Sequence, residues 1–516
     1  MEKLESYVAG EWIAGKGKPA VLVDPTTEEP VAEAGTEGVD FGKAVAYARD
    51  VGGAALRALT FAERGELLRA FSRAIHAHRD ELIELAVQNC GNTRGDAKFD
   101  IDGASGTLAW YADLGKELGA QRFLVDGEGI QLGRGPRFVG QHVFVPRAGV
   151  AVHVNAFNFP AWGLAEKAAC ALLAGMPVIS KPATSTAVVA HRIMRVAVDV
   201  LPKGALSFVA GAPGDLLTHL TGQDVLAFTG SSDTGVTIRT MPNVVKHAVR
   251  VNVEADSLNA AVLGPDVAEG DETFHMFVRD VVRDMTQKAG QKCTAIRRVF
   301  VPTARLEAAR EALASRLDEH KVGDPRVEGV TVGPLATAQQ QRDVRKGIEL
   351  LRAESASAHT LPISKDHGGA SGKGYFVEPT LFVGDGARAK AVHEHEVFGP
   401  ASTLLAYEST GDMIEQVRRG QGGLVASVYT EDRAFAGEAL FGIAPFHGRV
   451  MLGSEKIADQ APGPGTVLPQ MIHGGPGRAG AGEELGGVRG LAFYSQRVAV
   501  QGARPVLEAL LGTKKA

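Results

Sequence analysis

The chain has 516 residues, a length that corresponds to about three domains of ordinary size. Hydrophobic residues make up 45% and charged residues 22% of it, which excludes a disordered chain, a coiled coil and a collagen-like fibre. Its 55 basic and 60 acidic residues leave a net charge of −5 without a basic stripe, so we expect no nucleic-acid partner.

Targeting and membrane signals are not apparent in the sequence. Residues 1–15 lack the apolar core of a signal peptide, and the longest apolar stretches, such as 168–176, are too short to span a bilayer. The three cysteines, Cys90, Cys170 and Cys293, are far apart and form no Cys-x-x-Cys motif, which argues against disulfides and a cysteine zinc site. We therefore expect a cytoplasmic, reduced protein that does not bind membranes.

The first half of the chain begins with helices and continues with alternating strands and helices. Apolar residues recur at helical spacing over 41–90 and 97–118. A β-rich pattern follows at 138–145, then strands at 149–154, 176–180, 206–209, 225–228 and 248–253, with helices at 184–200, 215–220 and from about 232. This alternation is typical of a mostly parallel sheet covered on both faces, in which ligands bind beyond the carboxyl ends of the strands.

A second alternating region extends from about residue 270 to 445. The sequence predicts helices at 281–288 and 306–320 and strands at 298–301 and 424–429. The following stretch, 454–490, is rich in glycine, and we expect it to be irregular.

Cys293 is a candidate nucleophile because it lies in a polar, glycine-containing turn. Lys288 and Lys292 give this turn a positive setting, which favours the thiolate over the thiol. The alternative is a buried, inert cysteine, and we expect this for Cys90 and Cys170, which lie in apolar helical contexts.

Three more polar residues directly follow predicted strands. Glu254 is placed to act as a general base, Asn158 to stabilise an oxyanion through its amide, and Lys181 to reach a nucleotide ribose or phosphate. Each has a simpler alternative, namely a solvated acid, a turn asparagine before proline and a surface lysine.

Small residues after the strand 225–228 open a helix, so backbone N–H groups there are placed to face a pyrophosphate. The segment 475–480 matches the pattern G-x-G-x-x-G, but we expect neither a strand before it nor a helix after it, and we reject it as a dinucleotide fingerprint. The run HEHE at 393–396 lacks the spacing of a zinc site, so we expect no metal.

The order of these motifs is more specific than any one of them. NAFNFP (155–160), KPAT (181–184), FTGSSDTG (228–235), the strand ending at Glu254, GQKC (290–293) and EVFGP (396–400) follow one another. Together they resemble the aldehyde dehydrogenase superfamily over nearly the whole chain, from Tyr7 to Tyr494.

The resemblance implies an α/β fold with two Rossmann-like parallel-sheet domains and a small β oligomerisation arm. Residues 1–122 and 146–253 would form the NAD(P)-binding domain, and 254–455 the catalytic domain. Residues 123–145 and 488–516 would form the arm, through which the family assembles as dimers or tetramers.

The resemblance also implies catalytic roles. Cys293 would attack the aldehyde carbon to give a thiohemiacetal, and Asn158 with the Cys293 N–H would stabilise the oxyanion. Hydride transfer would leave a thioester, and Glu254 would activate the water that hydrolyses it.

The implied cofactor contacts follow the same motifs. Lys181 would contact the adenosine ribose, Ser231 and its neighbours Phe228 and Gly230 the pyrophosphate region, Glu396 the second ribose, and Phe398 the nicotinamide end. Thr184 stands where NAD-preferring members often have a glutamate. Because threonine tolerates a 2′-phosphate, we expect NADP, with NAD possible.

Departures from the motifs common in this superfamily indicate which of its members the sequence resembles most. VEADSLN (253–259), GQKCTAIRR (290–298) and HGGPGRAG (473–480) are similar to members that oxidise semialdehydes tethered to coenzyme A during aerobic breakdown of benzoyl-CoA or phenylacetate. One of these types carries a hydratase domain after the dehydrogenase. Since this chain stops at Ala516, we expect the stand-alone type, with a separately encoded hydratase as a possible partner.

Four residues are expected to contact the substrate: His473 and, with ordinary core packing as the alternative, Phe157, Phe159 and Trp162.

Three other functions stay open at this point. They are a general aldehyde dehydrogenase of broad range, a CoA-acylating enzyme, against which Glu254 argues, and a non-catalytic family member.

Overall fold

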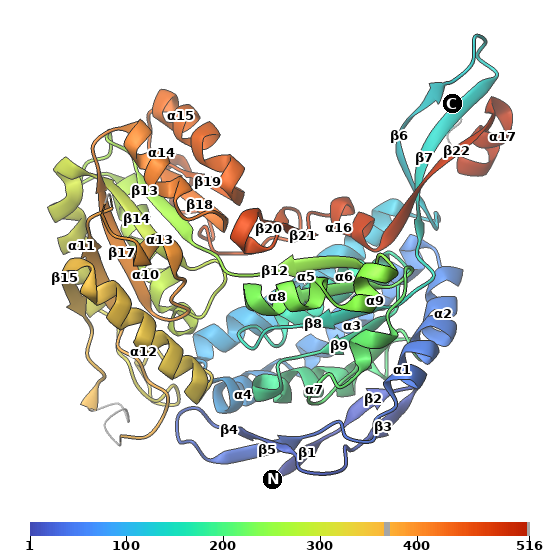
Figure 1. Cartoon of the computed structure of the whole chain (residues 1–516), viewed down its shortest axis with the longest axis horizontal. Helices are drawn as coiled ribbons and strands as arrows, with labels where there is room; N and C mark the ends of the chain where they lie inside the picture. The colour runs from blue at the N-terminus through green and yellow to red at the C-terminus, as the bar shows by residue number, and fades with distance from the viewer. Residues whose placement is uncertain (366–371, 387, 513–516) are drawn as a thin grey trace.

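The computed structural model describes residues 1–365, 372–386 and 388–512. Its two large sheets lie in separate halves, and a narrow three-stranded ribbon extends away from both (Figure 1). The expected α/β class with two mainly parallel sheets is confirmed. Among the described residues, no helix is long and apolar enough to cross a membrane.

The first sheet has seven strands in the order β12-β11-β8-β9-β10-β2-β3, of which the first five are parallel. Its strands are β2 (Ser6–Val8), β3 (Glu11–Ile13), β8 (Ala151–Val154), β9 (Val178–Lys181), β10 (Leu206–Phe208), β11 (Val225–Thr229) and β12 (Arg250–Glu254). The five parallel strands are those expected from the sequence, each within three residues of the predicted bounds.

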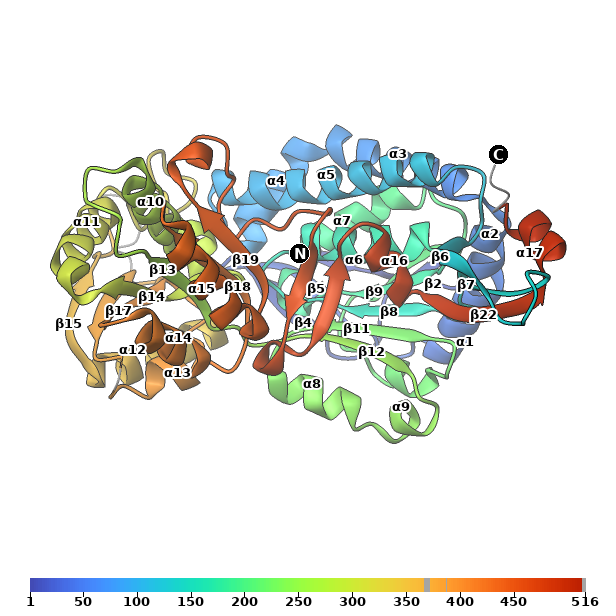
Figure 2. The ribbon, with the colours of Figure 1, turned by 90° about the horizontal axis from the view of Figure 1, so that it is seen from above.

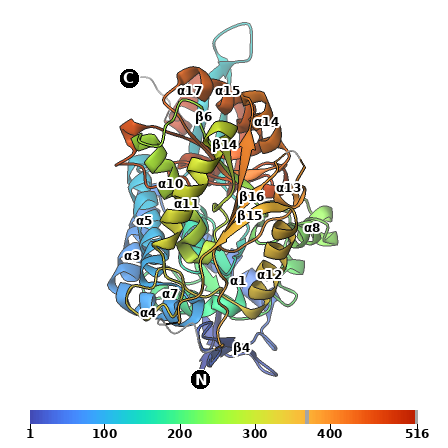
Figure 3. The same ribbon diagram turned by 90° about the vertical axis from the view of Figure 1, so that its left-hand side faces the viewer.

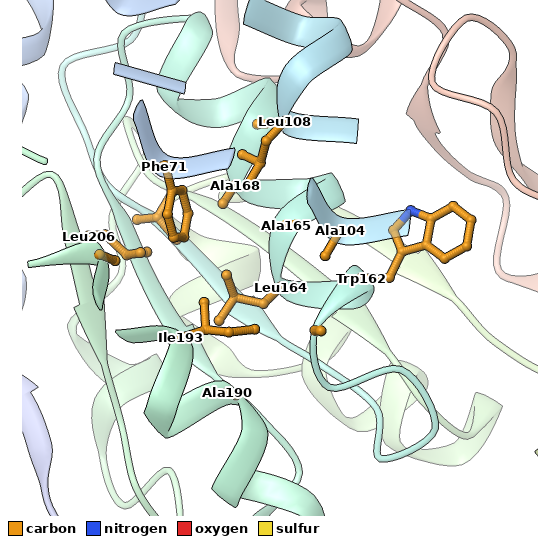
Figure 4. Packing of buried hydrophobic residues seen from close by; sticks show 14 of the residues in the cluster. Phe71, Ala104, Leu108, Trp162, Leu164, Ala165, Ala168, Ala190, Ile193 and Leu206 are labelled. Atoms are coloured by element: carbon orange, nitrogen blue, oxygen red, sulfur yellow. The ribbon is translucent and has the colours of Figure 1, made fainter. Parts of the chain in front are cut away.

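Several helices pack around this sheet. They are α5 (Arg94–Leu118), α6 (Trp162–Leu173), α7 (Ala187–Ala197), α8 (Ser232–Arg239) and α9 (Pro242–Lys246). Figure 4 shows Leu108 of α5, Ala165 of α6, Ile193 of α7 and Leu206 of β10, which belong to one apolar cluster. Small alanines on α6 let these helices approach closely, so the core is dense.

The expected helical stretch at 41–90 is broken into several helices. They are α1 (Phe41–Tyr47), α2 (Gly53–Ala58), α3 (Phe61–Ala77) and α4 (Arg79–Cys90). The side chain of Thr60 accepts a hydrogen bond from the N–H of Glu63, and Glu63 caps Thr60 in return, so a new helix starts here. Gly91, with φ 68°, ends α4.

The second sheet has the order β15-β16-β17-β14-β13-β18-β19, parallel except for β15. Its strands are β13 (Asn259–Leu263), β14 (Ile296–Pro302), β15 (Ser355–Thr360), β16 (Thr380–Gly384), β17 (Ala401–Tyr407), β18 (Gly423–Tyr429) and β19 (His447–Gly453). Its helices are α10 (Glu272–Thr286), α11 (Leu306–Asp318), α12 (Ala338–Ala353), α13 (Ala391–Glu394), α14 (Thr410–Arg418) and α15 (Arg433–Ile443). Figure 3 shows α10 and α11 on one face and α12 and α13 on the other.

Two sequence predictions in this half are wrong. The helix expected at 281–288 ends at Thr286, because Lys288 and Ala289 have φ of 53° and 52° and cannot continue it. The expected irregular stretch contains a two-stranded antiparallel sheet, β20 (Ile472–Gly475) with β21 (Gly482–Leu485), and the start of α16 (Val488–Phe493).

The extending ribbon consists of β6 (Leu124–Gln131), β7 (Phe138–Pro146) and β22 (Ser495–Ala503), followed by α17 (Arg504–Leu511). Figure 2 shows it at the end of the molecule opposite α11 and β15. A further small sheet near the amino terminus contains β1 (Glu2–Leu4), β4 (Ala20–Val23) and β5 (Pro30–Ala34).

Candidate active site

Cys293 lies in the short loop between α10 and β14, and this loop is held tightly. Gly290 has φ 70°, and a Cβ there would stand 2.3 Å from the Gly399 carbonyl oxygen, so only glycine fits. The side-chain amide of Asn259 donates hydrogen bonds of 2.8 Å to the carbonyl oxygens of both Cys293 and Ala295. The position of the thiol is therefore fixed by Asn259 on β13 and by the close packing of Gly290 against the main chain of Gly399.

Glu254 and His473 reach Cys293 from two other elements. Glu254 is the last residue of β12, as expected, and His473 stands on β20. His473 Nε2 lies 3.1 Å from Glu254 Oε1 and 3.9 Å from Cys293 Sγ. Thr229 at the end of β11 donates to the other carboxylate oxygen of Glu254 at 3.2 Å. A thiol, an imidazole and a carboxylate thus meet where strands of the first sheet end.

Burial and charge set the protonation of this group. Burial raises the pKa of the Cys293 thiol well above its usual value, and the carboxylate of Glu254 raises it further. Burial acts to raise the pKa of Glu254, but His473 outweighs it and holds that pKa well below the usual range. Burial lowers the pKa of His473, and the opposing effect of Glu254 leaves it raised. The structure therefore pairs an ionised carboxylate with a neutral thiol.

The expected positive setting of Cys293 is wrong. The ammonium of Lys292 turns away to Asp284 Oδ1 at 2.7 Å, and Lys288 Nζ lies over the Phe159 ring, 4.4 Å from its centre. The carboxylates near the thiol act in the opposite direction. Lys288 and Lys292 shape the loop, and they do not favour the thiolate.

The other two cysteines behave as expected. Cys90 and Cys170 are buried in α4 and α6, and burial raises the pKa of each thiol to about 12. Both thiols therefore stay protonated near neutral pH and are poor nucleophiles.

Asn158 lies beside the Cys293 loop, and its amide is engaged with it. Asn158 Nδ2 donates to the carbonyl oxygen of Gln291 at 3.0 Å, and Gln291 Oε1 accepts from the N–H of Ala336. Asn158 and Cys293 line the same cavity, so the amide is next to the space where an attacked carbonyl would lie.

A buried charged cluster behind Glu254 was missed by the sequence analysis. Lys167 Nζ lies 3.0 Å from Glu484 Oε2 and 3.3 Å from Glu166 Oε1. Glu484 stands opposite His473 in the β20–β21 pair. Burial raises the pKa of Glu484 to about 7. The signal was available, since an adjacent Glu and Lys inside the apolar helix α6 are rarely buried without a partner.

A narrow cavity of about 40 Å³ opens in front of Cys293. Three of the four residues predicted to contact the substrate, Phe159, Trp162 and His473, line it together with Phe99 and Val467. Phe157 does not lie there. It faces the neighbouring cleft, where its ring packs edge to face on Phe398 with centres 5.8 Å apart.

That neighbouring cleft collects most of the expected cofactor residues. It is lined by Lys181, Phe228, Gly230, Ser231, Glu396 and Phe398, and also by Asn155, Thr234 and Arg478. Ser231 caps α8 by accepting from the N–H of Thr234, so the N-terminus of this helix faces the cleft. Thr184 begins the turn Thr184–Thr186, next to the cleft-lining Ala183.

One carboxylate oxygen of Glu396 accepts a hydrogen bond, and the other has no hydrogen-bond partner among the described residues. Its Oε2 accepts from the N–H of Ser257 at 3.0 Å, while Oε1 is buried without a hydrogen-bond partner in the described residues, 3.7 Å from Arg297. Burial raises the pKa of Glu396 to about 7. A ribose hydroxyl would satisfy this orphaned oxygen, so the cleft fits a nucleotide.

The two other sequence motifs, residues 393–396 and 475–480, make contacts within the fold. In the run 393–396, His393 contacts Arg298 and the carbonyl oxygen of Gly386, while Glu394 and His395 are exposed. The segment 475–480 does follow a strand, contrary to our expectation, since β20 ends at Gly475. A short 3-10 turn, Gly477–Ala479, comes next, and the strand pairs only with β21.

The chain is similar to known proteins over most of its length. Over 482 residues the chain is 47% identical to 3,4-dehydroadipyl-CoA semialdehyde dehydrogenase of Aromatoleum evansii, which covers 92% of this chain and 93% of that protein. It is 29% identical to the NADP(+) succinate-semialdehyde dehydrogenase of Escherichia coli K12, over 84% of this chain and 88% of that protein.

A solved NAD+ complex of an aldehyde dehydrogenase from Bacillus cereus has the same fold. Its TM-score is 0.82 at 23% identity, covering 98% of this chain and 97% of that one. The profile of the aldehyde dehydrogenase family matches residues 12–500. This chain belongs to the aldehyde dehydrogenase family and is an oxidoreductase.

Proposed function

We propose that this protein oxidises the aldehyde end of a CoA-linked semialdehyde to a carboxylic acid, with NADP as the cofactor. The observation that carries the proposal is the position of Cys293, which lines both the cavity and the nucleotide cleft. A substrate carbon bonded to its sulfur would lie where the two spaces meet. The similarity to the A. evansii enzyme supports the choice of substrate.

The first step uses the thiol and its hydrogen-bond donors. As Cys293 Sγ attacks the aldehyde carbon, the thiol proton passes to the carboxylate of Glu254 and from there to solvent, and the aldehyde oxygen becomes an oxyanion beside Asn158 Nδ2 and the Cys293 N–H. Asn259 keeps the loop from moving as the bond forms. A bound nicotinamide nucleotide would supply the hydride acceptor, leaving a thioester on Cys293.

The second step uses Glu254. Its ionised carboxylate is in position to take a proton from a water molecule that attacks the thioester. His473 and Thr229 hold the two carboxylate oxygens in place. The acid leaves, and the thiol is restored. This base favours hydrolysis over transfer to free coenzyme A.

The choice of NADP rests on Thr184 and Lys181. A glutamate at residue 184 would repel a 2′-phosphate, whereas the threonine carries no charge. Burial lowers the pKa of Lys181, yet a phosphate placed near its ammonium would favour the charged form.

We assign residues 1–122 and 146–253 to nucleotide binding, 254–455 to catalysis, and 123–145 with 488–516 to oligomerisation. The ribbon exposes Val125, Ile130, Leu132, Phe138 and Val498. Exposed apolar residues on a sheet with a free edge are typical of an interface between subunits. Dimers or tetramers would cover them.

The test measures formation of NADPH and NADH by the purified protein. A CoA-linked semialdehyde is compared with hexanal and benzaldehyde, and wild type with Cys293→Ala. Fast NADP reduction confined to the CoA-linked substrate, and lost in the variant, supports the proposal. Equal rates with simple aldehydes would contradict the substrate, and activity retained by Cys293→Ala would contradict the mechanism. Addition of a separate hydratase tests for that partner.

A further inference from the structure

Three side chains of different metal-binding types meet in the active site. The Sγ of Cys293, the Nε2 of His473 and a carboxylate oxygen of Glu254 all lie within 4.8 Å of one another. They come from the loop before β14, from β20 and from the end of β12, so the fold itself brings them together. Thiolate, imidazole and carboxylate are the ligands that zinc takes in proteins.

The observed distances are close to those of a tetrahedral zinc centre. Usual zinc bond lengths require about 3.6 Å between sulfur and nitrogen and about 3.4 Å between nitrogen and oxygen. The structure has 3.9 Å from Cys293 Sγ to His473 Nε2, and 3.1 Å from His473 Nε2 to Glu254 Oε1. Shifts of a few tenths of an ångström, within the range of side-chain rotation, would convert one arrangement into the other.

The surrounding charges favour a cation at this point. Glu254, Glu166 and Glu396 all act on Cys293 as negative neighbours, against the positive Lys167 and Arg449. A second group of possible ligands, Glu166, Glu254 and Glu484, is already filled by the ammonium of Lys167. Cys293, His473 and Glu254 all line the cavity, which leaves room for a solvent ligand.

We propose that Cys293, His473 and Glu254 form a reversible zinc site that blocks the nucleophile. Binding releases two protons to solvent, the thiol proton of Cys293 and the Nε2 proton that His473 shares with Glu254, and forms zinc–sulfur and zinc–nitrogen bonds with no change of oxidation state. The metal also occupies the carboxylate of Glu254 and the imidazole of His473. The site goes beyond the proposed function, because zinc inhibits the enzyme and takes no part in turnover.

The test follows alkylation of Cys293 by iodoacetamide with peptide mass spectrometry, in the absence of substrate and cofactor. Zn²⁺ alone is the probe, Mg²⁺ the control, and a chelator reverses the effect. We expect Zn²⁺ to slow alkylation at least about tenfold, and His473→Asn to lower the zinc affinity by about tenfold or more. His275→Asn, on the exposed face of α10, is the matched control and should behave as wild type.

Two results would overturn the proposal: no protection of the wild-type thiol by Zn²⁺, or equal protection in wild type and His473→Asn. The second result would mean that zinc binds the thiol alone. If His473→Asn does not fold, Glu254→Gln provides the same comparison. Co²⁺ gives an independent readout, since a thiolate ligand adds a near-ultraviolet charge-transfer band that must be absent from Cys293→Ala. Because no substrate is used, these results stand apart from those that test the proposed function.

Discussion

The side-chain amide of Asn259 is bonded to the main chain of Cys293, 34 residues away in sequence, through a 2.8 Å hydrogen bond to its carbonyl oxygen. The oxygen of the same amide accepts from the N–H groups of Leu424 and Val425 at the start of β18. One buried side chain therefore connects the Cys293 loop to two strands of the second sheet, β13 and β18.

Replacement of Asn259 by leucine should lower both the stability and the activity of the protein. Several buried main-chain groups would lose their partners, so we expect the free energy of unfolding to fall by about 3 kcal/mol or more. Turnover should fall with it, because the Cys293 loop would no longer be held. Urea denaturation measures the loss. Asn243→Leu, at a partly exposed position, serves as the control, and an equally large loss there would contradict the role of Asn259.

Glu254→Gln should make Cys293 more reactive toward alkylation while abolishing turnover. The carboxylate raises the pKa of the thiol, so its removal increases the thiolate fraction near neutral pH. In wild type, the alkylation rate should rise steadily as the pH increases. Peptide mass spectrometry at several pH values measures both effects, with the buried Cys90 and Cys170 as unreactive internal controls. Slower alkylation of the variant would refute the proposed electrostatics.

Lys167→Met should destabilise the fold by about 3–5 kcal/mol, because it leaves buried carboxylates without their cation. The double variant Lys167→Met/Glu484→Gln removes one of these charges and should lose less. Thermal and urea denaturation of the two variants give the comparison. If the single variant were as stable as wild type, the cluster would not need its ammonium.

The affinity for NADP should rise as the pH increases from about 6 to 8. Glu396 has a pKa of about 7 because it is buried, and only its ionised form accepts hydrogen bonds through both oxygens. The same raised pKa means that its contribution to folding stability is lost as the pH rises through 7. Calorimetric titration of NADP at several pH values tests the prediction. Glu396→Gln should bind more weakly and without this pH dependence.

Thr184→Glu should shift the preference from NADP toward NAD by about tenfold or more, since a carboxylate near the 2′-phosphate costs at least about 1.4 kcal/mol. The ratio of kcat/KM for the two cofactors is the measurement. Thr184→Gln has a similar size without the charge, so an equal shift in that variant would exclude an electrostatic cause.

The parallel strands and the residues at their carboxyl ends were predictable because hydrophobic runs and strand order follow local rules. Glu254 is an example, since it directly follows a run of β-forming residues. Lys288 was not predictable as non-helical, because its positive φ is imposed by the loop around Gly290. The ion pair of Lys292 was equally hard to predict, since its partner Asp284 lies eight residues earlier, in α10, and the non-helical turn between them brings the two side chains together. The meeting of His473 with Glu254 depends on a tertiary contact across 219 residues.

The position of strands β20 and β21 in the sequence determines when the active site can form during synthesis. His473 is made 180 residues after Cys293, and Glu484 later still. A nascent chain that has not passed residue 484 holds its nucleophile without the imidazole and without the carboxylate that pairs with Lys167. The active centre is therefore completed only after β20 and β21 have been made, and proteolytic loss of these two strands would remove His473 and Glu484 from the site.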